Sequence, residues 1–205
     1  AYQDENIAAV MFDLFQREGG MRVPDHLYID EVRAVCDQDN WLMIMDEIQT
    51  GIGRTGQFFA YQHSQSIPDI VTSAKALGNG MPIGACLMRG KATNLFKPGN
   101  HGSTYGGNPL ACAASYAVLT TIQQENLCSH AASIGQYLQQ QLHEELNGHP
   151  NVVNIRGKGL MIGIEVDQSC RELVKMALNN KLLINVTAEK VIRLLPPLIL
   201  DQQAA

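Results

Sequence analysis

Three stretches of this chain carry side chains that could act together on one small molecule. Asp46 follows the apolar run WLMIM, and Lys75 follows a second apolar run within DIVTSAK. A loop of glycine, serine and threonine, HGSTYGG, leads into a helical pattern that starts near Pro109. The sequence therefore offers a carboxylate, an amine in a tight turn, and a loop of hydrogen-bond donors at the start of a helix.

Pyridoxal 5'-phosphate needs these three kinds of partner: a carboxylate for its ring nitrogen, a lysine for its aldehyde and donors for its phosphate. The carboxylate keeps the ring nitrogen protonated, so that the ring can accept electrons. The lysine amine can carry a proton to and from the reacting carbon. We therefore predict that Asp46 and Lys75 are catalytic residues acting with this cofactor.

Each of these residues also has an ordinary explanation when it is taken alone. A lysine after a strand is usually solvated, and an aspartate there often caps a turn. Ser103 and Thr104 are typical of a capped turn before a helix. Arg193 is most often a strand-edge ion pair of small energetic worth. The ordered combination favours the chemical interpretation, chiefly for Lys75 and Asp46.

The glycines of residues 51–56 match the dinucleotide-binding pattern G-x-G-x-x-G. That fingerprint needs its first glycine directly after a strand and its last glycine inside a helix that receives the pyrophosphate. Here five residues separate Trp41–Met45 and the first glycine, and the stretch after Gly56, QFFAY, is a poor helix start. The glycines are therefore predicted to shape a loop, with no dinucleotide involved.

Short apolar runs alternate with helical patterns in the first part of the chain. Residues 7–13 read as a buried strand, residues 41–46, 69–75 and 83–89 read as further short apolar strands, and a helix is expected from Pro24 to about Asp39. This order is typical of an α/β domain with a largely parallel sheet, whose ligand chemistry lies at the carboxyl ends of the strands. Asp13, Asp46 and Lys75 all fall at such ends.

The later part of the chain predicts a different architecture. A long helical pattern runs from Pro109 to about Leu146, with breaks expected near Asn126 and Ser133. Four short strand-like stretches (VVNIRGKG, LMIGIEV, LLINV and VIRLLPP) and a helix from about Ser169 to Lys181 then indicate a small α+β unit with antiparallel character. We predict a large domain over residues 1–148, including the long connecting helix, and a small C-terminal domain over residues 149–205.

Composition excludes several functional classes. The net charge of −5 comes without a basic stripe, which argues against nucleic acid and an anionic membrane as partners. No apolar run reaches the roughly 18 residues that span a membrane, and the first residues do not form a signal peptide. The five cysteines have no metal-ligand spacing, so we expect no metal site and reduced thiols in a cytoplasmic protein.

Five stretches together resemble one protein family from residue 7 to residue 201: DEIQTGIGRTGQFFAYQH, PDIVTSAKALGNGMPIGA, HGSTYGGNPLACAAS, NIRGKGLMIGIEV and VIRLLPPLIL. They are similar to the class III (ω-amino acid) aminotransferases, and most similar to the acetylornithine/succinyldiaminopimelate subgroup. The resemblance implies an α/β, fold-type-I, pyridoxal-phosphate-dependent transferase. It also implies a homodimer with its active site between the subunits.

The resemblance also implies a role for each matching residue. Asp46 would pair with the cofactor ring nitrogen, Gln49 would lie near the ring's phenolic oxygen, and Lys75 would bond to the aldehyde. Thr104, with the Ser103 backbone, would bind the phosphate of the neighbouring subunit's cofactor. Two further residues would handle the substrate. Arg193 would bind the α-carboxylate, and Glu18 would pair with Arg193 while an ω-amino substrate occupies the site.

The chain departs from the family pattern around Glu18. The family usually has E-P-I-Q-G-E-G-G where this chain has DLFQREGG, so Asp13, Leu14 and Arg17 are unusual. Arg17 could compete with Arg193 for Glu18. Family members are roughly twice this length, and the resemblance covers only their second half. The remaining sheet is therefore expected to expose an unpaired edge or an apolar face.

The expected reaction is transfer of the terminal amine of acetylornithine, or a similar ω-amino donor, to 2-oxoglutarate in arginine or lysine biosynthesis. Ornithine and 4-aminobutyrate stay open as donors within the family, and a decarboxylase or aminomutase of the same fold is a more distant alternative. A second interpretation is a non-catalytic fragment or dimerisation module that keeps the cofactor residues without holding the cofactor. The isolated 205-residue chain is expected to be inactive, because the family's phosphate-binding helix start and the aromatic that stacks on the ring belong to the half that the resemblance does not cover.

Overall fold

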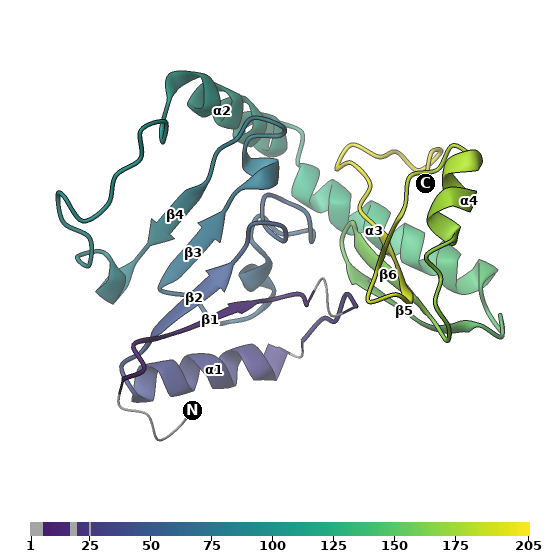
Figure 1. Cartoon of the computed structure of the whole chain (residues 1–205), viewed down its shortest axis with the longest axis horizontal. Helices are drawn as coiled ribbons and strands as arrows, with labels where there is room; N and C mark the ends of the chain where they lie inside the picture. The colour runs from purple at the N-terminus through teal and green to yellow at the C-terminus, as the bar shows by residue number, and fades with distance from the viewer. Residues whose placement is uncertain (1–5, 17–19, 25) are drawn as a thin grey trace. The chain divides into compact units, whose positions relative to one another are not determined.

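The chain forms two compact units, and a computed structural model describes residues 6–16, 20–24 and 26–205 of it (Figure 1). Each unit draws on segments that are separated in sequence. The first consists of Ala1–Leu14, Pro24–Ile52 and Phe59–Glu125. The second consists of Phe15–Val23, Gly53–Phe58 and Asn126–Ala205.

The first unit is built on a four-stranded sheet in the order β1-β2-β3-β4. β1 pairs with β2 and β2 with β3 in parallel, which confirms the predicted parallel character, whereas β4 runs antiparallel to β3. The β3–β4 connection holds only the short 3-10 turn η2 and no crossover helix, so a parallel return is not possible. The bounds are β1 Ala9–Asp13, β2 Leu42–Asp46, β3 Ile70–Ser73, η2 Lys75–Leu77 and β4 Ala85–Met88.

Helix α1 (His26–Gln38) matches the predicted helix and packs against β2. Ile29 and Cys36 of α1 are buried, as are Met43 and Met45 of β2. Tyr28 makes an edge contact with Phe12 of β1, with the ring centroids 6.3 Å apart. Burial of these apolar side chains holds the helix on the sheet.

The amino-terminal end of the sheet is tied to α1 by Asp69. Its Oδ2 accepts hydrogen bonds from Met43 N (2.9 Å) and from Arg33 Nη1 (2.8 Å), and both ionic side chains are only 14% exposed. Burial alone would raise the pKa of Asp69, but the Met43 N–H and the Arg33 guanidinium outweigh it and lower that pKa below its ordinary value. The carboxylate therefore stabilises the fold in its charged form.

We expect Asp69→Asn to lower the free energy of unfolding at pH 7 by about 1.5–3 kcal/mol, because a charge-assisted hydrogen bond is lost in a buried setting. A depressed folded pKa means that this stabilisation is present above the unfolded pKa and is lost as pH falls through the folded value. Urea titrations of wild type and variant should therefore converge below about pH 4. Asp37→Asn is the control, since Asp37 bonds to the same arginine but is 65% exposed; an equal loss from both variants would contradict the assignment.

The long helical pattern forms two helices. α2 spans Pro109–Gln124 and α3 spans Leu127–Glu145. Asn108 caps α2, with Oδ1 accepting from Ala111 N at 3.0 Å. The break expected near Asn126 is confirmed, because Asn126 adopts the left-handed conformation (φ 52°). The break expected near Ser133 is wrong, since α3 continues through it.

The second unit contains an antiparallel sheet in the order β5-β6-β8-β7. α3 covers its apolar face, where Ile134 and Leu138 pack with Ile155, Ile162 and Ile164. The predicted antiparallel character is confirmed, but α4 is shorter than the expected helix over residues 169–181. The bounds are β5 Val152–Lys158, β6 Met161–Val166, α4 Leu173–Asn179, β7 Asn185–Thr187 and β8 Val191–Leu194.

The position of α3 bears on the domain boundary. Gly135 of α3 lies so close to the β5–β6 turn that a Cβ there would be 2.1 Å from the carbonyl oxygen of Gly159. This close packing joins α3 to the second sheet. The compact units therefore divide after Glu125, whereas the sequence alone placed the boundary near residue 148, at the end of the helix.

Candidate active site

Asp46 is the last residue of β2 and lies in register with Asp13 of β1 and Thr72 of β3. Its Oδ1 accepts hydrogen bonds from Ile48 N at 2.9 Å and from Thr72 Oγ1 at 3.3 Å. Two donors on one oxygen fix the orientation of the carboxylate. This places an oriented, half-buried acid at the carboxyl end of the parallel strands, where such sheets bind ligands.

Lys75 lies just beyond the end of β3, at the start of η2. Its φ is 45°, in the left-handed region that few residues other than glycine adopt. The turn is tight: a Cβ on Gly78 would lie 2.1 Å from the carbonyl oxygen of Met81. Backbone strain of this kind is concentrated at functional positions. The ammonium group is exposed, so it is accessible to a ligand.

Gln49 joins the first two residues into one site. It follows Asp46 by three positions, and its Oε1 accepts a hydrogen bond from Lys75 Nζ at 3.4 Å. The structure thus brings the amine of Lys75 to the loop that starts at Asp46. Of the predicted site residues, Asp46, Gln49 and Lys75 therefore lie together at one end of the first sheet.

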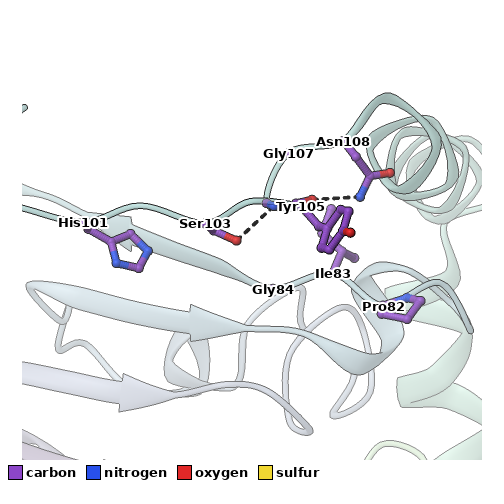
Figure 2. A pocket seen from close by; sticks show the side chains of 9 residues that line it. Pro82, Ile83, Gly84, His101, Ser103, Tyr105, Gly107 and Asn108 are labelled. Carbon is purple, nitrogen blue, oxygen red and sulfur yellow. Dashed lines mark hydrogen bonds between the residues drawn. The ribbon is translucent and has the colours of Figure 1, made fainter. Parts of the chain in front are cut away.

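Ser103 and Thr104 lie on the loop before α2. This loop borders an open pocket of about 420 Å³ (Figure 2). Ser103 Oγ accepts from Gly106 N at 3.0 Å, and Asn108 Nδ2 donates to the Tyr105 carbonyl at 2.9 Å. Ser103 lines the pocket, whereas Thr104 does not. The lining residues are Pro82, Ile83, Gly84, His101, Ser103, Tyr105, Gly106, Gly107 and Asn108.

The predictions for Arg193 and Glu18 concern substrate binding. Arg193 lies in β8 of the second unit, in register with Gly163 of β6 and Asn185 of β7. Glu18 and Arg17 are outside the described residues. Nearby, Gln16 and Arg22 pair as an antiparallel bridge, and Arg156 donates to the carbonyl groups of Gly20 and Met21. The roles of Arg193 and Glu18 stay predictions.

Two residues near the site were missed by the sequence reasoning. Thr72 donates to Asp46, and Glu47 is a fully buried acid beside it. Thr72 had a usable signal, because it stands three residues before Lys75 and parallel strands end at the same edge of a sheet. Glu47 had none beyond its place after Asp46, since two of its three hydrogen-bond partners, Ala60 and Tyr61, lie 13 and 14 residues downstream.

The glycines of residues 51–56 lie in a loop, as predicted. Gly53 and Gly56 have positive φ angles (84° and 91°). The chain then continues to the short 3-10 helix η1 (Ala60–His63), so no crossover helix begins at the last glycine. This arrangement lacks the helix N-terminus that a dinucleotide pyrophosphate needs.

The polar groups at the carboxyl end of the first sheet fit pyridoxal phosphate. An oriented carboxylate, an amide oxygen and an exposed amine converge there, and η2 contacts α2, the helix that follows the Ser103 loop. Within the described ranges, no group of three or more potential metal ligands was found. No helix in that part of the chain is long and apolar enough to cross a membrane.

Comparison with known proteins identifies the class. A model of the family "Aminotransferase class-III" matches residues 1–205. The chain is 48% identical over its whole length to acetylornithine aminotransferase from Nitrosomonas europaea, of which it covers 52%. It therefore spans about half the length of the curated relatives it matches. The chain belongs to the class III aminotransferases, which are pyridoxal-phosphate-dependent enzymes of fold type I.

Solved structures agree on the fold. Ornithine aminotransferase from Toxoplasma gondii superimposes with a TM-score of 0.93 at 38% identity, covering 98% of this chain and 49% of that one. Acetylornithine aminotransferase from Elizabethkingia anophelis gives 0.91 at 35% identity, covering 99% and 52%. The predicted family and fold class are thus confirmed. Pyridoxal phosphate, the cofactor of this family, is the predicted cofactor.

Proposed function

We propose that this chain is part of an aminotransferase that moves the terminal amine of acetylornithine, or of a similar ω-amino donor, to 2-oxoglutarate. The contact that carries the proposal is the hydrogen bond from Lys75 Nζ to Gln49 Oε1, on the loop that begins at the oriented carboxylate of Asp46. The high identity to acetylornithine aminotransferases supports this donor. Ornithine stays open, because ornithine aminotransferases are close in structure.

Three residues of the first unit would have different roles in the reaction. When bound, pyridoxal phosphate supplies an electron-accepting ring that makes a proton on the adjacent substrate carbon removable. Lys75 Nζ would take up that proton as a base and later release it as an acid. Asp46, oriented through Oδ1, would hold its carboxylate toward the ring nitrogen, and Gln49 would hold its amide toward the ring oxygen.

Substrate and phosphate would be held by the remaining predicted residues. Arg193 offers a planar guanidinium that can bind a carboxylate with two parallel hydrogen bonds. Glu18 would compete for that guanidinium while an ω-amino donor is bound. Thr104 and the Ser103 backbone would bind the cofactor phosphate of a neighbouring subunit in a homodimer. We place the reaction in arginine or lysine biosynthesis in the cytoplasm, as the relatives' donor and the unpaired cysteines suggest.

A second candidate is a non-catalytic module for dimerisation. The observation that favours it is the sheet of the first unit, in which β1 and β4 each pair on one side only among the described strands. Met11 of β1 is 59% exposed and Leu87 of β4 is 45% exposed. This agrees with the expected open edge, and such edges pair readily with other strands.

The two candidates are separated by supplying pyridoxal phosphate to the purified 205-residue chain, reducing with borohydride and mapping the modified lysines. We expect one dominant adduct on Lys75. A panel of acetylornithine, ornithine and 4-aminobutyrate with 2-oxoglutarate, assayed on the full-length enzyme, then identifies the donor. Scattered labelling together with no glutamate from any donor would favour the non-catalytic module.

A further inference from the structure

Glu47 is a fully buried acid that the proposed chemistry does not use. Its side chain accepts three hydrogen bonds within the first unit: Thr50 Oγ1 at 2.6 Å and Ala60 N at 2.9 Å on Oε2, and Tyr61 N at 2.8 Å on Oε1. Thr50 is also fully buried, and Ala60 is 1% exposed. A carboxylate is removed from water only at a cost that such donors must offset.

The partners of Glu47 lie at both ends of one loop. Thr50 is three residues downstream, whereas Ala60 and Tyr61 begin η1, where the chain returns. The carboxylate therefore closes the loop of residues 47–61 at its base. Gly51 makes this closure compact, because a Cβ there would lie 2.8 Å from the carbonyl oxygen of Glu47 and 3.1 Å from the Phe59 ring.

The main chain of Glu47 is fixed as well. Its N–H donates to the carbonyl of Thr72 at 2.9 Å, and its carbonyl accepts from Gly51 N at 3.0 Å. Asp46 precedes this anchored residue and Gln49 follows two positions later. A movement of residue 47 would therefore displace both the carboxylate and the amide that face the proposed cofactor ring.

We propose that Glu47 is a positioning residue: by closing the base of the 47–61 loop, it holds Asp46 and Gln49 in place beside Lys75. This inference rests on the proposed function, in which these two side chains meet the cofactor ring. Glu47 acts through the backbone and touches no reacting atom. Burial raises the pKa of Glu47 above its ordinary value, and the three hydrogen-bond donors offset part of that rise.

The main alternative is that Glu47 stabilises the fold in general and has no particular link to the site. Asp69 provides the matched control. It is also an acid that accepts a backbone N–H and a side-chain donor in the first unit, but it precedes β3, at the opposite end of the sheet from Lys75. Asp69→Asn should lower stability without moving the residues near Lys75.

The test compares Glu47→Gln, Thr50→Val and Asp69→Asn in the 205-residue chain. Glutamine is the conservative change, because it keeps the size of the side chain but presents an NH2 group to donors. We measure amide hydrogen exchange in peptides covering residues 46–52. We also measure how strongly pyridoxal phosphate and borohydride label Lys75 relative to the exposed lysines Lys91 and Lys97.

We expect Glu47→Gln to speed exchange at residues 48–51 by about tenfold, because a buried hydrogen bond to a charged group is lost. The preference for Lys75 should fall about fivefold, and Thr50→Val should give a smaller change in the same direction. Asp69→Asn should leave both readouts at wild-type values. If Glu47→Gln and Asp69→Asn behave alike at equal stability, Glu47 is only a general stabiliser and the proposal is overturned.

The outcome also distinguishes this inference from the proposed function. If wild type shows no preference for Lys75, the isolated chain does not form the cofactor site by itself, and exchange alone decides the role of Glu47. Faster exchange at residues 48–51 in Glu47→Gln, with none in Asp69→Asn, would then still support the loop closure. Unchanged exchange would overturn it.

Discussion

Replacing Lys75 with alanine is expected to lower the rate of amine transfer by on the order of 10³-fold or more, because the proposed covalent and proton-transfer group is removed. Lys75 is held at φ 45° in a turn where a Cβ on Gly78 would collide with the Met81 carbonyl. Its amine also reaches Gln49 on the loop that begins at Asp46.

The measurement is a single-turnover assay with the donor identified from the panel, together with borohydride trapping. The variant should lose the trapped adduct while keeping its fold, since the Lys75 side chain is exposed. Lys97→Ala is the matched control, because Lys97 is another exposed lysine of the same unit, away from the strand ends. A variant that transfers the amine within tenfold of the wild-type rate would exclude Lys75 as the acting lysine.

The second large effect is expected at Asp46. Asp46→Asn should reduce amine transfer by about 10²- to 10³-fold, because a neutral amide cannot stabilise positive charge on the cofactor ring nitrogen. Affinity for pyridoxal phosphate should fall as well, by about 1.5–3 kcal/mol for a charge-assisted contact. Asparagine retains Oδ1 as an acceptor for Ile48 N and Thr72 Oγ1, so the local structure is preserved.

Thr72→Val distinguishes the effect of the charge of Asp46 from the effect of its orientation. It removes one donor to Oδ1 but leaves the carboxylate and its bond to Ile48 N. We expect a loss in rate of less than about tenfold, the worth of one hydrogen bond. Equal effects of Asp46→Asn and Thr72→Val would show that orientation of residue 46, and not its charge, matters. The pH dependence of the visible absorbance of the bound cofactor provides a second readout of the ring nitrogen.

Local patterns accounted for most of the elements. Four apolar runs gave four strands, and Pro109 and Asn126 marked the start of α2 and the break before α3. These signals are short-range: proline suits the first turn of a helix, and asparagine tolerates left-handed angles. The break expected at Ser133 failed for a tertiary reason, because the buried face of α3 continues across it to Leu138 and holds the helix together.

The sequence by itself determined the α/β class, the family and the order of the chemical residues, because these depend on residue types and their spacing. Only the tertiary structure decided which groups form hydrogen bonds to Asp46 and to the buried acid beside it. Parallel pairing brings Thr72 to Asp46, and a closed loop brings Ala60 and Tyr61 to the buried Glu47. The tertiary structure also showed that α3 belongs with the second sheet. Such partners are set by strand register and packing between distant segments, and no local preference of the chain encodes them.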